Sequence, residues 1–149
     1  MTLPELHIRA FLQLFLLFFI AVTLLSLPFS SYAANIITHP DNQSPITIFQ
    51  ARAIFAGKKR YWSNGNPIRI VIMNEDSPSH ERFCRKLLNV FPRQLRRSWD
   101  RNIYSGAGEG PVIVNSEQEM LDYISNHPYA IGYTDQTTEK EAIHVISFE

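Results

Sequence analysis

The sequence predicts one α/β domain with a largely buried mixed sheet, preceded by a segment that directs export. Three observations predict this. Short runs rich in β-branched residues alternate with amphipathic helical stretches, which is the pattern of an α/β domain. Of the 149 residues, 45% are hydrophobic and 19% are charged, as in an ordinary globular protein. Close to the N-terminus, residues 11–27 form an almost unbroken apolar stretch.

The N-terminal segment has the features of a secretory signal peptide. Arg9 precedes the apolar run of 17 residues, Pro28 ends it, and small residues flank Tyr32 where signal peptidase reads the chain. We therefore predict a signal peptide over residues 1–33 and a single periplasmic domain over residues 34–149. The alternative is an uncleaved membrane anchor, because 17 apolar residues lie at the lower limit for a bilayer span. After cleavage, no membrane span is expected.

The first half of the domain should contain two strands and one helix. Ile36–Thr38 is β-rich and reads as a short strand. Thr47 and Gln50 have capping-box spacing, so a helix is expected to begin there, and Gly57 suits its end. Ile68–Met73 is almost continuously apolar, which predicts a strand covered on both faces.

The second half should contain three helices and three strands. Ser77 and Pro78 are the expected N-cap and first residue of one helix, and Pro92 is expected to start the next. Ser116 and Glu119 repeat the capping-box spacing. The expected strands are Val112–Val114, Tyr129–Tyr133 and Ala142–Phe148. Together these elements give the order strand, helix, strand, two helices, strand, helix and two strands, which predicts an α/β domain.

Charge is distributed unevenly along the chain. Residues 52–101 hold twelve Lys and Arg against four acids, a net charge of +8, whereas residues 102–149 hold one Lys against eight acids, a net charge of −7. The expected third helix carries Leu95, Trp99 and Ile103 at a spacing of four, and its other faces carry Arg93, Arg96, Arg97 and Arg101. We interpret these arginines as a solvated face. The alternative is contact with a phosphate, an anionic lipid or an acidic partner.

No pattern in the sequence indicates a disulfide, a metal site or a catalytic centre. Cys84 is the only cysteine, so no internal disulfide forms, and its helical position favours a buried apolar role over a reactive thiol. The histidines lack metal-ligand spacing. The one catalytic-type pairing is His80 near Ser77 and Ser79, and a helix-surface histidine explains it as well. We therefore expect no enzyme, no cofactor, no metal and no nucleic-acid partner, and we interpret the Gly106–Gly110 loop as a flexible turn.

The junction between the second strand and the second helix is the candidate ligand site. A helix that begins at the end of a buried strand presents free N–H groups and the positive end of its dipole. Asn74, Ser77 and Ser79 add an amide and two hydroxyl donors, so these three are the predicted ligand-binding residues. The alternative is that Ser77 only caps its helix, and Glu75 and Asp76 oppose anion binding unless they point away.

Several segments in a fixed order resemble one lobe of the phosphate-type periplasmic binding proteins. The resemblance covers the chain from about Ile36 to Tyr133. The segments are Ile54–Lys59, Trp62–Gly65, Ile70-Val71 leading to Ser77–Ser79 and Phe83, then Trp99, Tyr104–Gly108 and Tyr129–Tyr133. The resemblance implies a single three-layer lobe of the periplasmic-binding-protein-like fold (type II) with a mixed sheet.

The resemblance also implies where a ligand would bind. In the family, this strand-to-helix junction reads Ser-Gly-Thr, with an arginine four positions before the serine, and it grips phosphate. Ser77 matches the serine, Ser79 keeps the hydroxyl of the threonine, and Pro78 replaces the glycine. Met73 stands at the place of the arginine, so the charge-assisted part of the grip is missing.

Two functions follow from these observations. The first is an exported solute-binding protein for phosphate or another small oxyanion in ABC-type transport. The second is a non-transport accessory or sensor-partner domain derived from one lobe, which binds an envelope protein. Because only one lobe is present, an anion would be exposed to water and held weakly. A homodimer is one way to rebuild the cleft.

Overall fold

The computed structural model describes Gln13, Phe15, residues 34–135 and residues 143–148. Backbone contacts divide the chain into residues 1–31 and residues 32–149, and the fold below belongs to the second unit. Apart from Gln13 and Phe15, the predicted signal peptide lies outside the described residues, as does its cleavage site, and both stay predictions. None of the helices in the described ranges is both long enough and apolar enough to span a bilayer.

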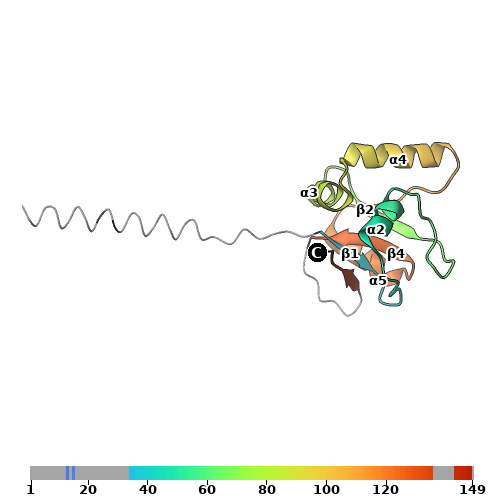
Figure 1. Cartoon of the computed structure of the whole chain (residues 1–149), viewed down its shortest axis with the longest axis horizontal. Coiled ribbons are helices and arrows are strands. Elements are labelled where there is room, and N and C mark those ends of the chain that lie inside the picture. Colours follow the sequence, from blue (N-terminus) through green and yellow to red (C-terminus); the bar gives the residue numbers. More distant parts are fainter. Residues whose placement is uncertain (1–12, 14, 16–33, 136–142, 149) are drawn as a thin grey trace, which may run out of the picture. The chain divides into compact units, whose positions relative to one another are not determined.

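A five-stranded mixed sheet forms the centre of the domain, with the strand order β3-β2-β4-β1-β5 (Figure 1). β2 (Arg69–Met73) runs parallel to both β3 (Val112–Val114) and β4 (Ala130–Thr134). β1 (Asn35–Thr38) is antiparallel to β4 and to β5 (His144–Ile146). The carboxyl ends of β2, β3 and β4 therefore meet at one edge of the sheet.

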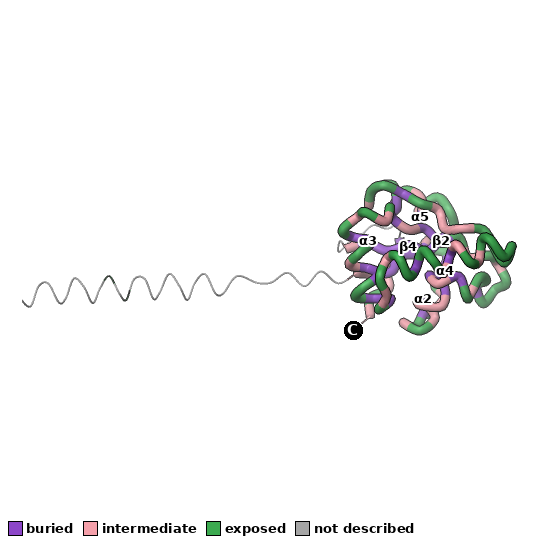
Figure 2. Tube along the Cα trace, turned by 90° about the horizontal axis from the view of Figure 1, so that it is seen from above, coloured by how far each residue is buried: buried purple, intermediate pink, exposed green. Residues whose placement is uncertain are grey.

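Helices cover both faces of this sheet, which confirms the predicted three-layer α/β architecture. Figure 2 shows α5 (Glu117–Asn126) on one side of β2 and β4, and α2 (Ile48–Phe55) with α4 (Pro92–Tyr104) on the other. α3 (Pro78–Arg82) continues without a break into η1 (Phe83–Leu88), a π-helical segment that also lies on the α2 side.

The α5 face is packed closely against the sheet at Gly132. A Cβ atom placed on Gly132 would overlap the sulfur of Met120 on α5. Met120 and Ile124 are fully buried against β4. A side chain at position 132 would therefore require the Met120 side chain to move, with a loss of packing.

The opposite face is an aromatic cluster. The rings of Phe83 and Tyr133 stack with centroids 3.7 Å apart, and Phe55 meets Phe83 edge-on at 4.7 Å. Trp99 of α4 donates its indole N–H to the carbonyl of Phe55 at 2.9 Å, which joins α4 to α2. Among the described residues, the buried apolar side chains of the core fall between Ile36 and Ile143. Because residues 32–149 form a compact unit, the domain of residues 34–149 is expected to fold on its own.

Most helix boundaries follow the predicted signals. Thr47 and Gln50 exchange both hydrogen bonds of a capping box at the start of α2. Gly57 has a φ of 72° just after the C-cap of α2, a conformation that favours glycine. Pro92 is the first residue of α4.

Three details differ from the predictions. Glu119 bonds to the N–H of Asn115 and not to that of Ser116, so only half of the second capping box forms. Ile103 is 46% exposed, because it lies beyond the part of α4 that covers the core. The last strand is shorter than expected, and Ala142 lies outside the described residues.

Candidate functional site

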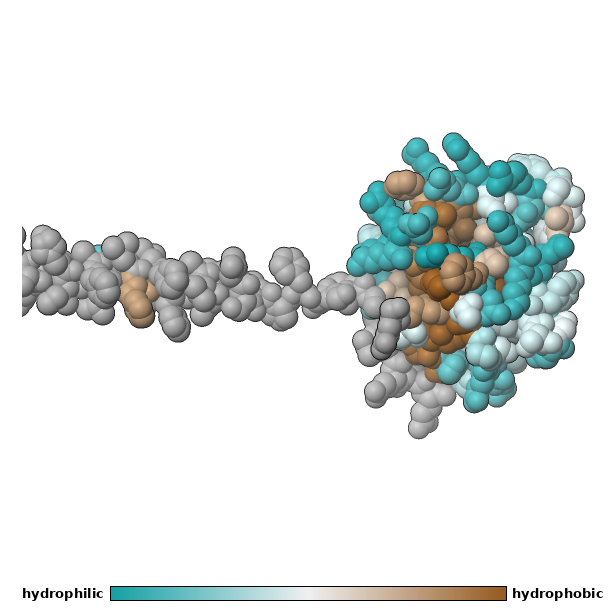
Figure 3. Space-filling model, viewed as in Figure 1, coloured by the Kyte–Doolittle hydropathy of each residue, from teal (hydrophilic) through white to brown (hydrophobic). Residues whose placement is uncertain are grey.

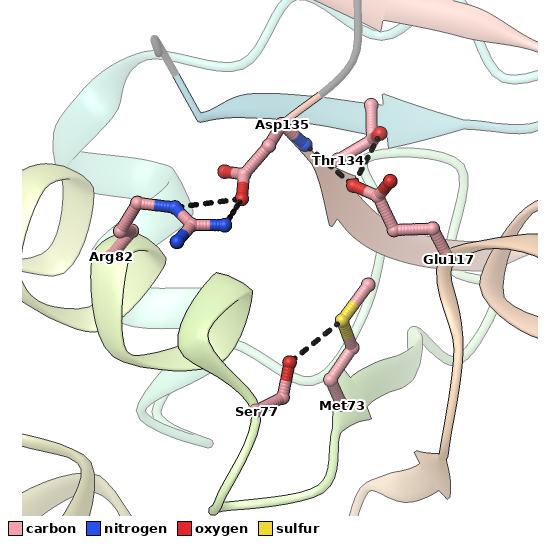
Figure 4. Close-up of polar contacts among 6 residues, drawn as sticks. All are labelled: Met73, Ser77, Arg82, Glu117, Thr134 and Asp135. Carbon is pink, nitrogen blue, oxygen red and sulfur yellow. Dashed lines mark hydrogen bonds and ion pairs between the residues drawn. The ribbon is translucent and has the colours of Figure 1, made fainter.

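A pocket of about 440 Å³ opens at the edge where β2, β3 and β4 end. Its walls are the start of α3, the start of α5 and the residue that follows β4. In sheets of this kind ligands bind outside the carboxyl ends of the strands, where neighbouring connections diverge. Here β2 lies between β3 and β4, so the pocket occupies that position. Figure 4 shows side chains from these elements arranged around a central space.

Ser77 lies on this pocket, but its hydroxyl does not cap α3 as the sequence predicted. The backbone of Ser77 is in the extended N-cap conformation, yet its side chain forms no capping hydrogen bond. The hydroxyl instead points to the sulfur of Met73 at 3.5 Å, a weak contact (Figure 4). The N–H groups of Ser79 and His80, in the first turn, have no acceptor within the helix.

Ser79 also lies on the pocket and is 7% exposed. Its Oγ is buried and has no hydrogen-bond partner among the described residues. A buried hydroxyl in this state is unusual, since nearly all buried polar groups in proteins are paired. The threonine-like hydroxyl predicted from the resemblance is therefore present at the pocket.

Asn74 is not brought to the pocket. Its side chain is exposed, and its Oδ1 accepts a hydrogen bond from the N–H of Asp76 at 3.4 Å. Glu75 forms an ion pair with Arg96 at 2.7 Å. Neither Glu75 nor Asp76 lines the pocket, so the condition set for anion binding at this junction is met.

Arg82 supplies the cation that the sequence interpretation found missing. It follows Pro78 by four residues, so it lies one turn along the same face of the helix, and it lines the pocket. Its Nε donates to Oδ2 of Asp135 at 2.9 Å, and its Nη2 pairs with the same oxygen (Figure 4). The side chain of Asp135 is only 5% exposed, and its Oδ1 has no partner among the described residues.

Glu117, the first residue of α5, accepts hydrogen bonds from donors at the end of β4. One of its carboxylate oxygens accepts from the hydroxyl of Thr134 at 3.1 Å and from the N–H of Asp135 at 2.9 Å. Arg82, Asp135 and Glu117 were not singled out from the sequence. The signals that could have identified them are that Arg82 lies one helical turn from Pro78, Asp135 directly follows β4, and Glu117 directly follows the N-cap Ser116.

A buried hydrogen-bonded chain holds α3 in place. The hydroxyl of Tyr133 accepts from the N–H of Met73 at 2.9 Å and lies 2.6 Å from Nδ1 of His80. Nε2 of His80 lies 3.5 Å from the sulfur of Cys84. This chain ties the end of β2, β4 and the first turns of the α3 helix together, and so it fixes the corner that carries Ser77 and Ser79.

His80 is therefore not the surface residue that the sequence predicted, because it is 2% exposed. Burial lowers its pKa, against the opposing field of Glu75. Burial also raises the pKa of Cys84 to about 12 and raises the pKa of Tyr133. Cys84 is fully buried, which fits the predicted apolar role. A thiol held protonated in this way is a poor nucleophile.

The pocket combines donors with acceptors. Ser77, Ser79 and Arg82 donate, while Asp135 and Glu117 accept. Within the described ranges, no three His, Cys, Asp or Glu side chains are grouped closely enough to hold a metal ion. The arrangement can bind a small polar molecule that both accepts and donates hydrogen bonds.

No protein-family model matches the sequence, and no curated protein matches it. Among solved structures, the chain is similar to a phosphate-bound ABC-transporter substrate-binding protein from Clostridium perfringens, with 19% identity and a TM-score of 0.60. The match covers 76% of this chain and 44% of that one. PstS from Borrelia burgdorferi gives 19% identity, a TM-score of 0.58, and coverage of 77% and 46%.

An ABC-type phosphate transport receptor from Vibrio cholerae is also similar, with 16% identity, a TM-score of 0.57, and coverage of 76% of this chain and 45% of that one. Likeness at these identities shows the fold. The chain spans less than half the length of each of these proteins, as expected for a single lobe. The chain therefore has the predicted α/β fold of one lobe of the phosphate-type periplasmic binding proteins.

Proposed function

We propose that this chain is an exported, single-lobe binding protein that takes a small protonated oxyanion, such as hydrogen phosphate, at the pocket beside α3. The observation that carries the proposal is the meeting of Ser77, Ser79 and Arg82 at the carboxyl edge of the sheet. Two of the similar structures, a phosphate-bound substrate-binding protein and a phosphate transport receptor, support this ligand class.

The dipole of the α3 helix and the buried hydroxyl of Ser79 favour an anion at this point. The N–H groups of the first turn point away from the helix, and the unpartnered Oγ of Ser79 lies beside them. Arg82, one turn further along the same helix, adds positive charge to the pocket, and Asp135 pairs with it. A bound anion would give the Ser79 hydroxyl the partner that the protein itself does not.

The two carboxylates on the pocket select for a ligand that carries a proton. Asp135 and Glu117 both line the wall opposite Ser77. A fully ionised anion would be repelled by them, whereas an oxyanion with an O–H group can donate to a carboxylate oxygen. Hydrogen phosphate has such a group at neutral pH, and sulfate does not. We therefore expect phosphate to be preferred over sulfate.

A second candidate is an accessory domain that binds an envelope protein through this edge. It is favoured by Glu117, whose carboxylate already accepts hydrogen bonds from Thr134 and Asp135. In that case an acidic or hydroxyl side chain of the partner would take the place of the free anion. A role in ABC-type transport belongs to the first candidate, and a sensor or accessory role to the second.

Isothermal titration calorimetry of the domain of residues 34–149 with phosphate and with sulfate tests the proposal. The pocket is open and screened by water, so we expect a dissociation constant on the order of 1 mM for phosphate. Ser79→Ala should remove the binding heat. Ser105→Ala is the matched control, because Ser105 is an exposed helix-end serine far from the pocket lining.

The outcomes separate the two candidates. Saturable heat with phosphate, lost in Ser79→Ala and kept in Ser105→Ala, supports the oxyanion function. No heat at millimolar phosphate, or equal heat with sulfate and phosphate, contradicts it. Reproducible recovery of one envelope protein, abolished by Ser79→Ala, would then support the accessory function.

A further inference from the structure

The face of the domain opposite α5 carries a second groove, between α2 and α4, with a volume of about 410 Å³. Its floor is apolar and includes Leu88 and Leu95. Ser98 of α4 donates to the carbonyl of Ala56 at 3.1 Å, which joins the two walls at one end. The groove therefore lies between two helices that are fixed relative to each other.

The ionisable residues that line this groove are all cations. They are Arg52, Lys58 and Arg101, and no carboxylate lies among the lining residues. Arg52 donates its Nε to the carbonyl of Leu87 at 3.0 Å, so its position is fixed by the fold. Across the described residues, no ion pair is seen for these three cations, whereas Arg69, Arg82, Arg85 and Arg96 each face a carboxylate.

Apolar surface accompanies this charge. Phe49, on the rim of the groove, is 75% exposed. Figure 3 shows apolar atoms gathered over α2 and beneath α4, with hydrophilic atoms at both margins. A large exposed aromatic ring beside unpaired cations is the combination that favours the boundary between lipid headgroups and acyl chains.

We infer that the α2–α4 groove is a docking surface for an anionic phospholipid bilayer. Arg52, Lys58 and Arg101 face the headgroup phosphates, and Phe49 enters the boundary region. Charge complementarity selects this occupant, because a cationic groove without carboxylates attracts anionic headgroups and does not attract zwitterionic ones.

Co-sedimentation of the domain of residues 34–149 with lipid vesicles tests this inference. One set contains phosphatidylcholine with about one third phosphatidylglycerol, and the other contains phosphatidylcholine alone. We expect binding to the first set only. Lys58→Gln and Arg101→Gln should each lower the partition coefficient about fivefold, as expected for one cation near an anionic surface. Thermal unfolding of each variant confirms that it is folded.

Arg93→Gln is the matched control. Arg93 is an exposed α4 arginine that lies outside the groove and forms no ion pair within the described part of the chain. A loss in Arg93→Gln equal to that in Arg101→Gln would show diffuse attraction and overturn the inference. Equal binding to both vesicle types would also overturn it.

Two further experiments test whether a lipid bilayer is the partner that binds this groove. In Phe49→Trp, tryptophan emission should shift to the blue with phosphatidylglycerol vesicles, because the ring enters an apolar layer; an unchanged emission contradicts this orientation. Polyglutamate that competes as well as the vesicles would point to an acidic protein and overturn the lipid assignment. Ser79→Ala should leave vesicle binding unchanged, so this inference and the proposed oxyanion function fail independently.

Discussion

Two helices begin at the same edge of the sheet. Each has a serine at its N-cap, but the two serine hydroxyls form different contacts. Ser116 starts α5, and its hydroxyl accepts from the N–H of Glu119 at 3.1 Å, which is an ordinary N-cap. Ser77, the N-cap residue of α3, also has an extended backbone, yet its hydroxyl does not cap the helix. One serine therefore stabilises its helix, while the other is turned to the pocket.

The two helix starts also differ in where carboxylates lie. Glu119 of α5 accepts from the N–H of Asn115, and Glu117 accepts from the end of β4. The acid in the first turn of α3, Glu81, instead pairs with Arg85 at 3.2 Å. The protein thus uses its own anions at the start of α5, whereas the acids nearest the start of α3, which are Glu75, Asp76 and Glu81, do not line the pocket. This difference is why we assign the ligand to α3.

The largest expected effect on stability comes from the Tyr133 hydroxyl, which is part of the hydrogen-bonded chain that holds α3 in place. Tyr133→Phe removes the hydroxyl that serves Met73 and His80, and leaves two buried polar groups without a partner. We expect the free energy of unfolding to fall by about 2–4 kcal/mol. Urea denaturation measures it.

Tyr123→Phe is the control for this substitution, because Tyr123 is only half-buried and stacks on His127 near the surface. It should change the free energy of unfolding by less than about 0.5 kcal/mol. If the two variants are equally stable, the hydroxyl of Tyr133 does not hold the corner.

A pH effect on stability is the next in size. Burial lowers the pKa of His80 in the folded state below the ordinary value of 6.5. At pH above 6.5, the ring is neutral in both states and adds no pH dependence. Below 6.5, the unfolded chain binds the proton first, so stability falls with decreasing pH, by at most about 1.4 kcal/mol per pH unit for this group.

Urea denaturation between neutral pH and pH 5 measures this effect. His80→Gln, which cannot titrate, should be less stable at neutral pH and should lack this part of the decline. A decline of the same steepness in His80→Gln would assign the pH dependence to the carboxylates instead.

The comparison of the two serines gives the third prediction. Ser116→Ala should lower the free energy of unfolding by about 1 kcal/mol, the usual effect of removing an N-cap. Ser77→Ala should change it by only a few tenths, since its hydroxyl makes one weak contact with Met73. Thermal unfolding of the two variants side by side measures the difference. Equal destabilisation would mean that Ser77 caps α3 in solution.

The sequence predicted the architecture well, because its signals are local. Capping residues such as Thr47, the turn at Gly57 and proline at helix starts act within one turn of the chain. The strand pattern also indicated the buried sheet. Burial that depends on an element distant in sequence was harder to predict. His80 was expected at the surface, but it contacts Tyr133 of β4, 53 residues away, and is buried.

The candidate site was predicted only in part. Ser77 and Ser79 are on the pocket because they belong to one junction. Arg82, Asp135 and Glu117 come from three connections that only the strand order brings together. Asn74 was expected to bind because it is adjacent in sequence, but the turn after β2 directs its amide to Asp76.

The smallest expected effect on stability is that of Ser79→Ala. Because Oγ of Ser79 has no hydrogen-bond partner in the part of the chain that the structure describes, we expect the free energy of unfolding to be unchanged or to rise by up to about 1 kcal/mol. A loss of more than about 1 kcal/mol on chemical denaturation would show that the hydroxyl serves the fold and is not reserved for a ligand.

Amide chemical shifts of the ¹⁵N-labelled domain during titration with phosphate test the central claim most directly. We predict saturable shifts of the Ser79 and His80 amides, which start α3, with much smaller shifts at Ser116 and Glu117, and little response to sulfate. Shifts confined to the α5 start, or spread over the arginines of α4 without saturation, would contradict the assignment of the ligand to α3.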